Sequence, residues 1–216
     1  MKPSHRIPSV VAIILAAGHS RRMGGDDKLL KTIHGIPLIR RVLMAALGSH
    51  CCDTSLVLQP GQDRRTRSIS DLPVRLIFSM RAASGMATSL ASGITAQPVH
   101  HQAAGALILL ADMPDIDSTD IDRLLRGFVP GRIVAATCNG KLGHPVILPQ
   151  ELWPAACQLN GDVGARSLLQ HNPDLLDKVE LPFGHAITDL DTPADWEIWQ
   201  NQDKAVTGSA ISGSMN

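Results

Sequence analysis

The segment Val10–Lys28 reads VVAIILAAGHSRRMGGDDK. Its first six residues form a short apolar run rich in β-branched side chains, which predicts a buried strand. A turn of small residues, Ala16, Ala17 and Gly18, follows directly, and small residues let the backbone approach a ligand closely. Ligands of open α/β sheets bind beyond the carboxyl ends of the strands, so this turn lies where a binding site is expected.

Positive charge follows the turn. Arg21, Arg22 and Lys28 have the sign and donor groups that bind phosphate. A Walker A loop would need a Lys-Ser or Lys-Thr pair after the glycines, and a dinucleotide fingerprint would need G-x-G-x-x-G; the segment has neither. A flexible loop with incidental charges would explain neither the small residues nor the basic cluster. The segment therefore predicts a phosphate-binding loop of another type.

Strand-like and helix-like patterns alternate along the rest of the chain. We expect strands at 55–58, 74–78, 106–110 and 133–136 and a short extended piece at 146–148, with helices at 37–47, 85–94, 118–126, 163–170 and 192–200. Ser118 and Thr192 are the expected N-caps of two of these helices, and Pro193 and Asp195 support the second. This alternation predicts an α/β fold with a mostly parallel sheet. We expect one domain over residues 1–203 and a flexible, Ser/Gly-rich tail over 204–216.

The charges are balanced in total and unbalanced along the chain. Residues 1–81 hold 13 Lys and Arg against 5 Asp and Glu, a net +8, and residues 82–216 hold 7 against 15, a net −8. The neutral total argues against a protein that coats nucleic acid, and three Phe, three Trp and no Tyr offer no platform for stacked bases. We expect much of the basic excess, including Arg64, Arg65 and Arg67, to be ordinary solvated surface.

Cysteine usage and hydropathy bear on the compartment. The four cysteines form no C-x-x-C pair, which favours free thiols in a reducing environment. No apolar run reaches the roughly 18 residues that a membrane span needs. No signal-peptide cleavage pattern follows the first strand. We therefore expect a cytoplasmic protein that binds neither membrane nor nucleic acid.

The extended loop sequence LAAGHSRRMGGDDKLL resembles the signature L-A-A-G-x-S-x-R-M-G-x-x-x-K-L-L of the MobA-like nucleotidyltransferases. The resemblance implies a Rossmann-like three-layer sandwich of the nucleotide-diphospho-sugar transferase type. Within the family the loop is most similar to molybdenum cofactor cytidylyltransferases, because relatives that transfer guanylate usually carry Leu-Ala-Gly-Gly at its start. The resemblance further implies that the nucleotide lies against Leu15, Ala16, Ala17 and Gly18, with Arg22 on its phosphates and Lys28 on the α-phosphate.

The segment Ser84–Ile94, SGMATSLASGI, has a small-residue start followed by helical spacing. On the residues alone, a well-packed helix of small residues is the better interpretation, although a helix N-terminus also suits an anion or the edge of a base. The family has a Gly-Met-x-x-Ser-Leu segment here. The resemblance implies a base and ribose pocket lined by Gly85, Met86, Ser89 and Leu90.

Acidic residues occur at the ends of two predicted segments. Asp112 ends a strand in LADMP, where a carboxylate facing a triphosphate would hold Mg²⁺; a turn-capping aspartate before Pro is the alternative. Family members usually have Gly where this chain has Ala111. The segment Asp189–Pro193, DLDTP, resembles the family's closing D-I-D-T-P motif, and residues two apart in an extended segment point to the same side. We prefer Asp191 as the second Mg²⁺ ligand and leave Asp189 open.

Two later motifs also match the family pattern. GHPVIL, at 143–148, resembles a strand near the acceptor substrate, and we interpret His144 as a pocket residue. GDVGAR, at 161–166, matches a helix-start motif in which Arg166 would hold a phosphate; a solvated helix charge is the alternative. Trp196 and Trp199, three residues apart, are expected to be core anchors.

These observations predict a Mg²⁺-dependent nucleotidyltransferase in which Arg22, Lys28 and Asp112 are the catalytic residues. By resemblance, the reaction is transfer of CMP from CTP to Mo-molybdopterin, giving molybdopterin cytosine dinucleotide and pyrophosphate, with a molybdenum hydroxylase as a transient partner. Three alternatives stay open. They are a cytidylyltransferase acting on a sugar or polyol phosphate, a non-catalytic molybdopterin carrier, and an oxidoreductase, although the dinucleotide fingerprint is missing.

Overall fold

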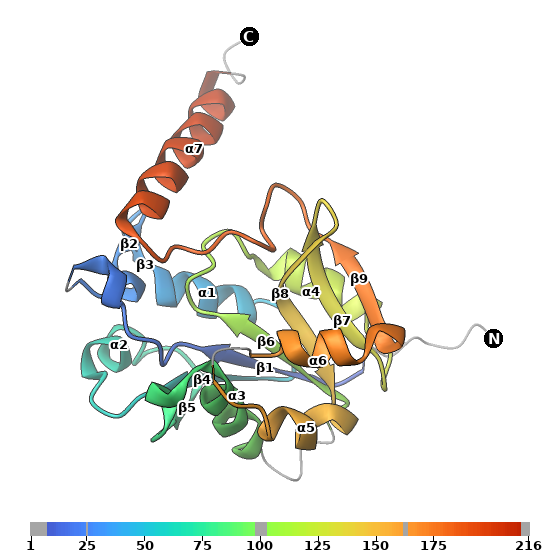
Figure 1. Cartoon of the computed structure of the whole chain (residues 1–216). Coiled ribbons are helices and arrows are strands. Elements are labelled where there is room, and N and C mark those ends of the chain that lie inside the picture. The colour runs from blue at the N-terminus through green and yellow to red at the C-terminus, as the bar shows by residue number, and fades with distance from the viewer. Residues whose placement is uncertain (1–7, 25, 98–102, 162–163, 213–216) are drawn as a thin grey trace.

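A seven-stranded sheet forms the centre of the chain, as the computed structural model shows for the residues it describes, 8–24, 26–97, 103–161 and 164–212 (Figure 1). The strand order is β5-β4-β1-β6-β8-β7-β9, and only β8 runs antiparallel to its neighbours. The bounds are β1 Val10–Leu15, β4 Asp53–Leu58, β5 Arg75–Phe78, β6 Gly105–Leu110, β7 Ile133–Cys138, β8 Lys141–Pro149 and β9 Leu176–Glu180. A separate hairpin joins β2 (Thr32–Ile33) to β3 (Ile36–Pro37).

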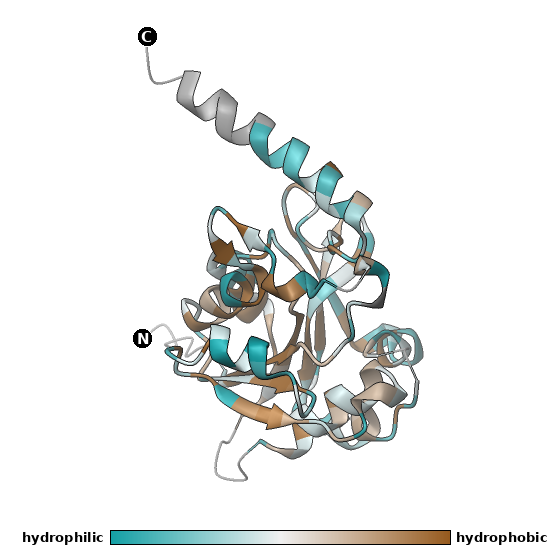
Figure 2. Ribbon diagram, turned by 90° about the vertical axis from the view of Figure 1, so that its left-hand side faces the viewer, coloured by the Kyte–Doolittle hydropathy of each residue, from teal (hydrophilic) through white to brown (hydrophobic). Residues whose placement is uncertain are grey.

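Strand β1 is buried on both faces, which explains why its residues are continuously apolar. Alternate side chains enter two different cores. Val10, Ala12 and Ile14 belong to one hydrophobic cluster, and Val11 and Ile13 belong to the other. The strands of the sheet are coloured mainly as hydrophobic in Figure 2, and hydrophilic residues are frequent in the outer helices. The sheet is therefore the middle layer of three.

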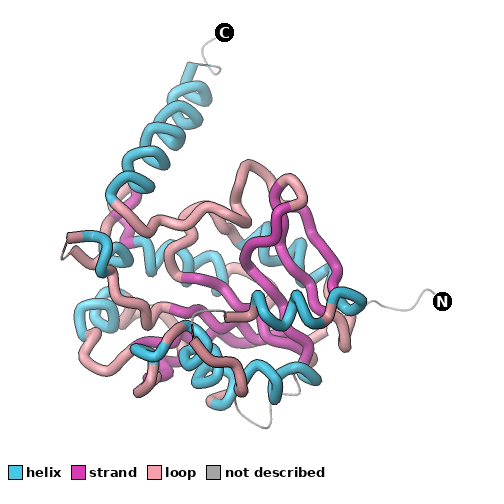
Figure 3. Tube along the Cα trace, viewed as in Figure 1, coloured by secondary structure: helices cyan, strands magenta, loops and turns pink. Residues whose placement is uncertain are grey.

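Helices cover both faces of the sheet (Figure 3). The first cluster includes residues of α1 (Leu38–Leu47), α4 (Ser118–Gly127) and the start of α7 (Pro193–Ser212), and the second includes residues of α3 (Met86–Thr95), α5 (Trp153–Cys157) and α6 (Arg166–His171). Helix α2 (Asp63–Ser68) packs against a short 3-10 turn, η2 (Lys28–Leu30). The predicted three-layer α/β sandwich is confirmed.

Several local predictions need correction. Helix α4 is capped by Asp117 and not by Ser118, because the Asp117 side chain accepts the Asp120 N–H while the Asp120 carboxylate accepts the Asp117 N–H. The piece expected at 146–148 is the end of the nine-residue strand β8, whose hydrophobic pattern is interrupted by glycine and proline. Elements β2, β3, β9, α2 and α5 were not expected, since none has a run of periodic apolar residues.

The last helix is longer than expected. The Thr192 hydroxyl and the Asp195 carboxylate cap it as predicted. Trp196 and Trp199 are buried core anchors, also as predicted. Helix α7 continues past Gln200 to Ser212, into the segment for which we predicted a flexible tail, and it points away from the body of the molecule (Figure 1). Among the described residues, no helix has the length and apolar composition needed to cross a bilayer, and all four cysteines are free as expected.

The order of the strands shows at which edge of the sheet a binding site is expected. The chain runs from β1 outward to β4 and β5, and then returns to place β6 on the other side of β1. The carboxyl ends of β1 and β6 therefore lie side by side at the point where the connections diverge, with Leu15 paired to Leu110. Crevices at such switch points are where open α/β sheets bind ligands.

Candidate active site

A cavity of about 520 Å³ opens at the carboxyl ends of β1 and β6. Its walls come from the turn after β1, the start of α3, the end of β6 and the segment before α7. Most of the residues predicted from the sequence line it together: Leu15, Ala16, Ala17, Gly18, Arg22, Lys28, Gly85, Met86, Ser89, Asp112, Asp189 and Asp191. The structure thus brings one basic and one acidic group of residues into a single cavity.

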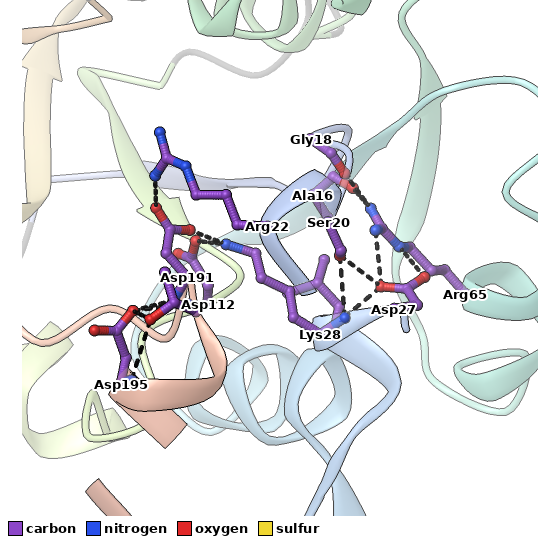
Figure 4. A network of polar contacts seen from close by, with 12 residues as sticks. Ala16, Gly18, Ser20, Arg22, Asp27, Lys28, Arg65, Asp112, Asp191 and Asp195 are labelled. Atoms are coloured by element: carbon purple, nitrogen blue, oxygen red, sulfur yellow. Dashed lines mark hydrogen bonds and ion pairs between the residues drawn. The ribbon is translucent and has the colours of Figure 1, made fainter. Parts of the chain in front are cut away.

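Lys28 lies between two carboxylates in this cavity (Figure 4). Its ammonium group is 2.5 Å from an oxygen of Asp112 and also binds Asp191. Arg22 donates to the second oxygen of Asp191 at 3.0 Å, and its own side chain is largely exposed. Burial lowers the pKa of Lys28, but the charges and hydrogen bonds of the two carboxylates outweigh burial and raise it above the usual value. Lys28 is therefore a buried group at the cavity wall that is charged at neutral pH.

Asp112 fixes the segment that carries the other two carboxylates. The Leu190 N–H donates to the Asp112 carbonyl at 3.1 Å, so Asp189 and Asp191 flank this anchor. Carboxylate oxygens of all three aspartates lie within 4.8 Å of one another. Burial, together with the charges of Asp112 and Asp191, raises the pKa of Asp189. Such crowding of like charges is relieved by a bound cation.

The start of α3 forms the opposite wall. Gly85 has φ 115°, in a region that side chains disfavour, and it turns the chain from the 3-10 turn η3 (Ala82–Ser84) into the helix. Ser89 lies one turn further along and is 5% exposed. Leu90 is fully buried in the second hydrophobic cluster and does not line the cavity, since consecutive helix residues point in directions about 100° apart.

Two other predicted residues lie outside the cavity lining. His144 is part-buried on β8, and its Nδ1 is 3.5 Å from the Ile108 carbonyl. Burial lowers the pKa of His144, so its ring is neutral at physiological pH. Arg166 is exposed at the first residue of α6. Of its predicted motif, residues 162 and 163 lie outside the described residues.

One buried residue was missed. We expected Arg65 to be solvated surface, and this is wrong: the residue is only 3% exposed. Its guanidinium binds both oxygens of Asp27 and the carbonyl oxygens of Ala16 and Gly18 (Figure 4). The sequence around it, DRRTRS, has no apolar face that would indicate which arginine folds inward.

Solved structures with the same fold support this architecture. The chain is similar to Rv0371c of Mycobacterium tuberculosis, with a TM-score of 0.77 at 20% identity over 90% of this chain and 98% of that one. A manganese complex of Rv0371c gives a TM-score of 0.69 at 19% identity, over 88% of this chain and 96% of that one. At these identities the similarity shows the fold alone.

The chain belongs to the family of MobA-like NTP transferase domains, whose sequence model matches residues 12–177. It is accordingly an enzyme of the nucleotidyltransferase type, as predicted. It is similar to the nicotine blue oxidoreductase of Paenarthrobacter nicotinovorans, 29% identical over 194 residues that cover 86% of this chain and 94% of the relative. It is also 29% identical, over 184 residues, to a molybdenum cofactor guanylyltransferase of Rhodopseudomonas palustris, covering 84% of this chain and 83% of the relative.

Proposed function

We propose that this enzyme transfers CMP from CTP to Mo-molybdopterin, in a Mg²⁺-dependent reaction that gives molybdopterin cytosine dinucleotide and pyrophosphate. The observation that carries the proposal is the contact of Lys28 with Asp112 and Asp191 at the wall of the cavity that the Ala16–Gly18 turn lines. The enzyme acts in the cytoplasm and passes its product to a molybdenum hydroxylase.

The basic residues of the cavity bind the triphosphate. Lys28 places a point charge beside the α-phosphate, and the exposed guanidinium of Arg22 reaches the outer phosphates. Gly85, Met86 and Ser89 face the base and ribose from the start of α3. The choice of cytidine rests on Leu15-Ala16-Ala17-Gly18, since similar enzymes that transfer guanylate usually have Leu-Ala-Gly-Gly.

The three aspartates fit a divalent cation. Oδ1 of Asp112 is buried and has no hydrogen-bond partner among the described residues, which leaves an anionic oxygen free to coordinate. A donor set made only of carboxylate oxygens suits Mg²⁺. Asp112 and Asp191, with Asp189 beside them, would hold the ion, which supplies positive charge against the triphosphate when it is bound.

The chemistry needs positioning more than proton transfer. An anionic oxygen of the acceptor's terminal phosphate attacks the α-phosphorus and forms a new P–O bond. The bond from that phosphorus to the bridging oxygen breaks, and pyrophosphate leaves with the electron pair. Because the attacking oxygen is already ionised, no general base is required, and the proposal gives no acid–base role to His144, which lies outside the cavity lining. Lys28 and Arg22 stabilise the charge that develops on the phosphates.

Pyrophosphate release with each of the four NTPs, with and without molybdopterin, tests the proposal. Of the four NTPs, we expect CTP to be the one that supports turnover, and we expect that turnover to require the pterin. Asp112→Ala should abolish it while the protein stays folded, and Asp174→Ala, at an exposed site just before the edge strand β9, should leave it unchanged. Turnover with GTP and with none of the other NTPs would contradict the argument that Ala17 favours cytidine nucleotides. Turnover with a sugar or polyol phosphate in place of the pterin would change the acceptor, and pterin binding without pyrophosphate would indicate a carrier.

An oxidoreductase is the second candidate, because the similarity to a nicotine blue oxidoreductase covers 86% of this chain. Flavin or nicotinamide that copurifies with the protein, and reduction of nicotine blue by that cofactor, would favour this activity. We expect neither, since the cavity combines a triphosphate-binding lysine with three carboxylates.

A further inference from the structure

We propose that Arg65 is a positioning residue for nucleotide binding: it holds both ends of the loop after β1, so that the amide groups of Ala17 and Gly18 face the cavity. The inference rests on the proposed function and extends it to a residue outside the cavity lining. Arg65 lies on α2, and it is 37 residues after Lys28 in the chain.

The carbonyl groups of the turn are held by side chains from one direction. Nη1 of Arg65 donates to the carbonyl oxygens of Ala16, at 2.5 Å, and Gly18, at 2.9 Å. Gln62, at the start of the same helix, donates through Nε2 to the Ala17 carbonyl at 3.4 Å. Three consecutive carbonyl oxygens are therefore bound on the side of α2.

The backbone N–H groups of the turn differ from its carbonyl groups in their hydrogen bonding. Within the described part of the chain, the N–H groups of Ala17, Gly18 and His19 donate to no protein acceptor, although all three residues line the cavity. Ala17 is buried, and buried amides almost always have a partner, whereas Gly18 and His19 are exposed. Successive free amides form a concave site for an anion or for the acceptor edge of a base. By binding the carbonyls from behind, Arg65 keeps their negative ends away from the triphosphate.

Arg65 also holds the far end of the loop. Its Nε and Nη2 donate to the two oxygens of Asp27 at 2.7 and 2.8 Å. Asp27 in turn accepts the Leu29 N–H and the Ser20 hydroxyl, and the Ser20 hydroxyl accepts the Lys28 N–H (Figure 4). One guanidinium thus connects the turn at residues 16–18 to the backbone that carries Lys28.

The geometry of this group requires arginine. A guanidinium presents five donors in a fixed plane, and here that plane meets a carboxylate and two carbonyls at once. A lysine would keep the charge but could not reproduce this set of directions. The Arg40–Asp71 pair offers a control, because it is also a two-point ion pair, formed through Nη1 and Nη2 at an exposed site, and neither residue lines the cavity.

The test compares Arg65→Met, Arg65→Lys and the control Arg40→Met. For each we would measure KM and kcat for the NTP that turns over, amide hydrogen exchange in a peptide spanning residues 16–28, and the melting temperature. We expect Arg65→Met to raise KM at least tenfold with a smaller change in kcat, and to speed exchange in that peptide. Arg65→Lys should raise KM nearly as much, and Arg40→Met should change neither constant more than twofold.

Three outcomes would overturn the inference: an unchanged KM in Arg65→Met, a wild-type KM in Arg65→Lys, or an equal rise in Arg40→Met. Should Arg65→Met fail to fold, Arg65→Lys and Gln62→Leu carry the same comparison. A wild-type protein that releases no pyrophosphate overturns the proposed function instead. Equilibrium binding of the NTPs then replaces KM, and a wild type that binds none of them overturns both.

Discussion

The ammonium group of Lys28 lies 2.5 Å from a carboxylate oxygen of Asp112, although 84 residues separate the two in the chain. The same ammonium binds Asp191, so one lysine occupies the space between two proposed metal ligands. A divalent cation bound there would compete with Lys28 for these carboxylates. In the proposed function, the α-phosphate of an entering triphosphate would offer Lys28 a new anionic partner and so free the carboxylates. Nucleotide and metal are therefore expected to bind together.

Replacement of Lys28 by methionine separates its contribution to turnover from its competition with the metal ion. Lys28→Met should lower turnover by about 100-fold, the usual cost of losing one charged donor to the reacting phosphate. It should also tighten Mn²⁺ binding in the absence of nucleotide, by about tenfold, because the competing charge is gone. Titration with Mn²⁺ followed by EPR measures the affinity, and Lys178→Met, at an exposed site on β9, is the control. Weaker Mn²⁺ binding in Lys28→Met would contradict the competition.

The aspartates at 189 and 191 should differ in importance. Asp191 binds both Lys28 and Arg22, whereas Asp189 is the exposed member of the three. We expect Asp191→Asn to weaken Mn²⁺ binding and turnover by roughly tenfold or more, and Asp189→Asn to have the smaller effect on both. Mn²⁺ titration and pyrophosphate release on the two variants give the comparison. The reverse order would make Asp189 the ligand.

The parts of the site that follow directly from local sequence were predictable. The bounds of β1 are those expected from its apolar run, and the small residues after it line the cavity as predicted. Asp112 was also placed correctly, because a residue that follows a buried parallel strand has one edge of the sheet to occupy. These features depend only on a strand and on the residues that follow its carboxyl end. The pattern of apolar side chains in the sequence indicates both.

Features that depend on how distant segments pack were not predictable. Arg65 lies among exposed arginines in a short polar helix, and its burial follows from where α2 docks, not from its own neighbours. Leu90 matched a family motif but packs in the core, because the motif records a helix and not which of its faces meets the ligand. The contact between Lys28 and Asp191 spans 163 residues.

Gly143→Ala should damage the site from outside the cavity. A Cβ at this position would lie 1.8 Å from the Ala186 carbonyl oxygen, and the neighbouring His144 N–H donates to that same oxygen at 2.9 Å. The segment leading to Asp189 would therefore have to move. We expect a loss of about 2 kcal/mol in the free energy of unfolding, typical of overpacking, together with lower turnover.

Chemical denaturation and pyrophosphate release measure the two effects of Gly143→Ala. Leu142→Ala, next to it and partly exposed, is the control and should change both only slightly. An unaltered turnover in a destabilised Gly143→Ala would show that the segment before Asp189 tolerates the shift.

The ion pair of Asp27 with Arg65 should make stability depend on pH. Burial raises the pKa of Asp27, but the hydrogen bonds and charge of Arg65 outweigh burial and lower it below the usual value. A lowered pKa means that the stabilisation is complete above the pKa of the unfolded chain, near 3.8, and is lost as the pH falls through the folded value.

Asp27→Asn removes this ion pair and leaves Arg65 a buried cation without a charged partner. We expect it to be less stable than the wild type at pH 7, by about 3 kcal/mol, a common cost of breaking a buried pair. The difference should shrink below pH 4, because protonation of Asp27 then removes the same interaction from the wild type. Urea denaturation of both proteins between pH 2.5 and 7 measures it. A difference that stays constant over this range would mean that the Asp27 charge does not hold the loop, and that the shape of the side chain does.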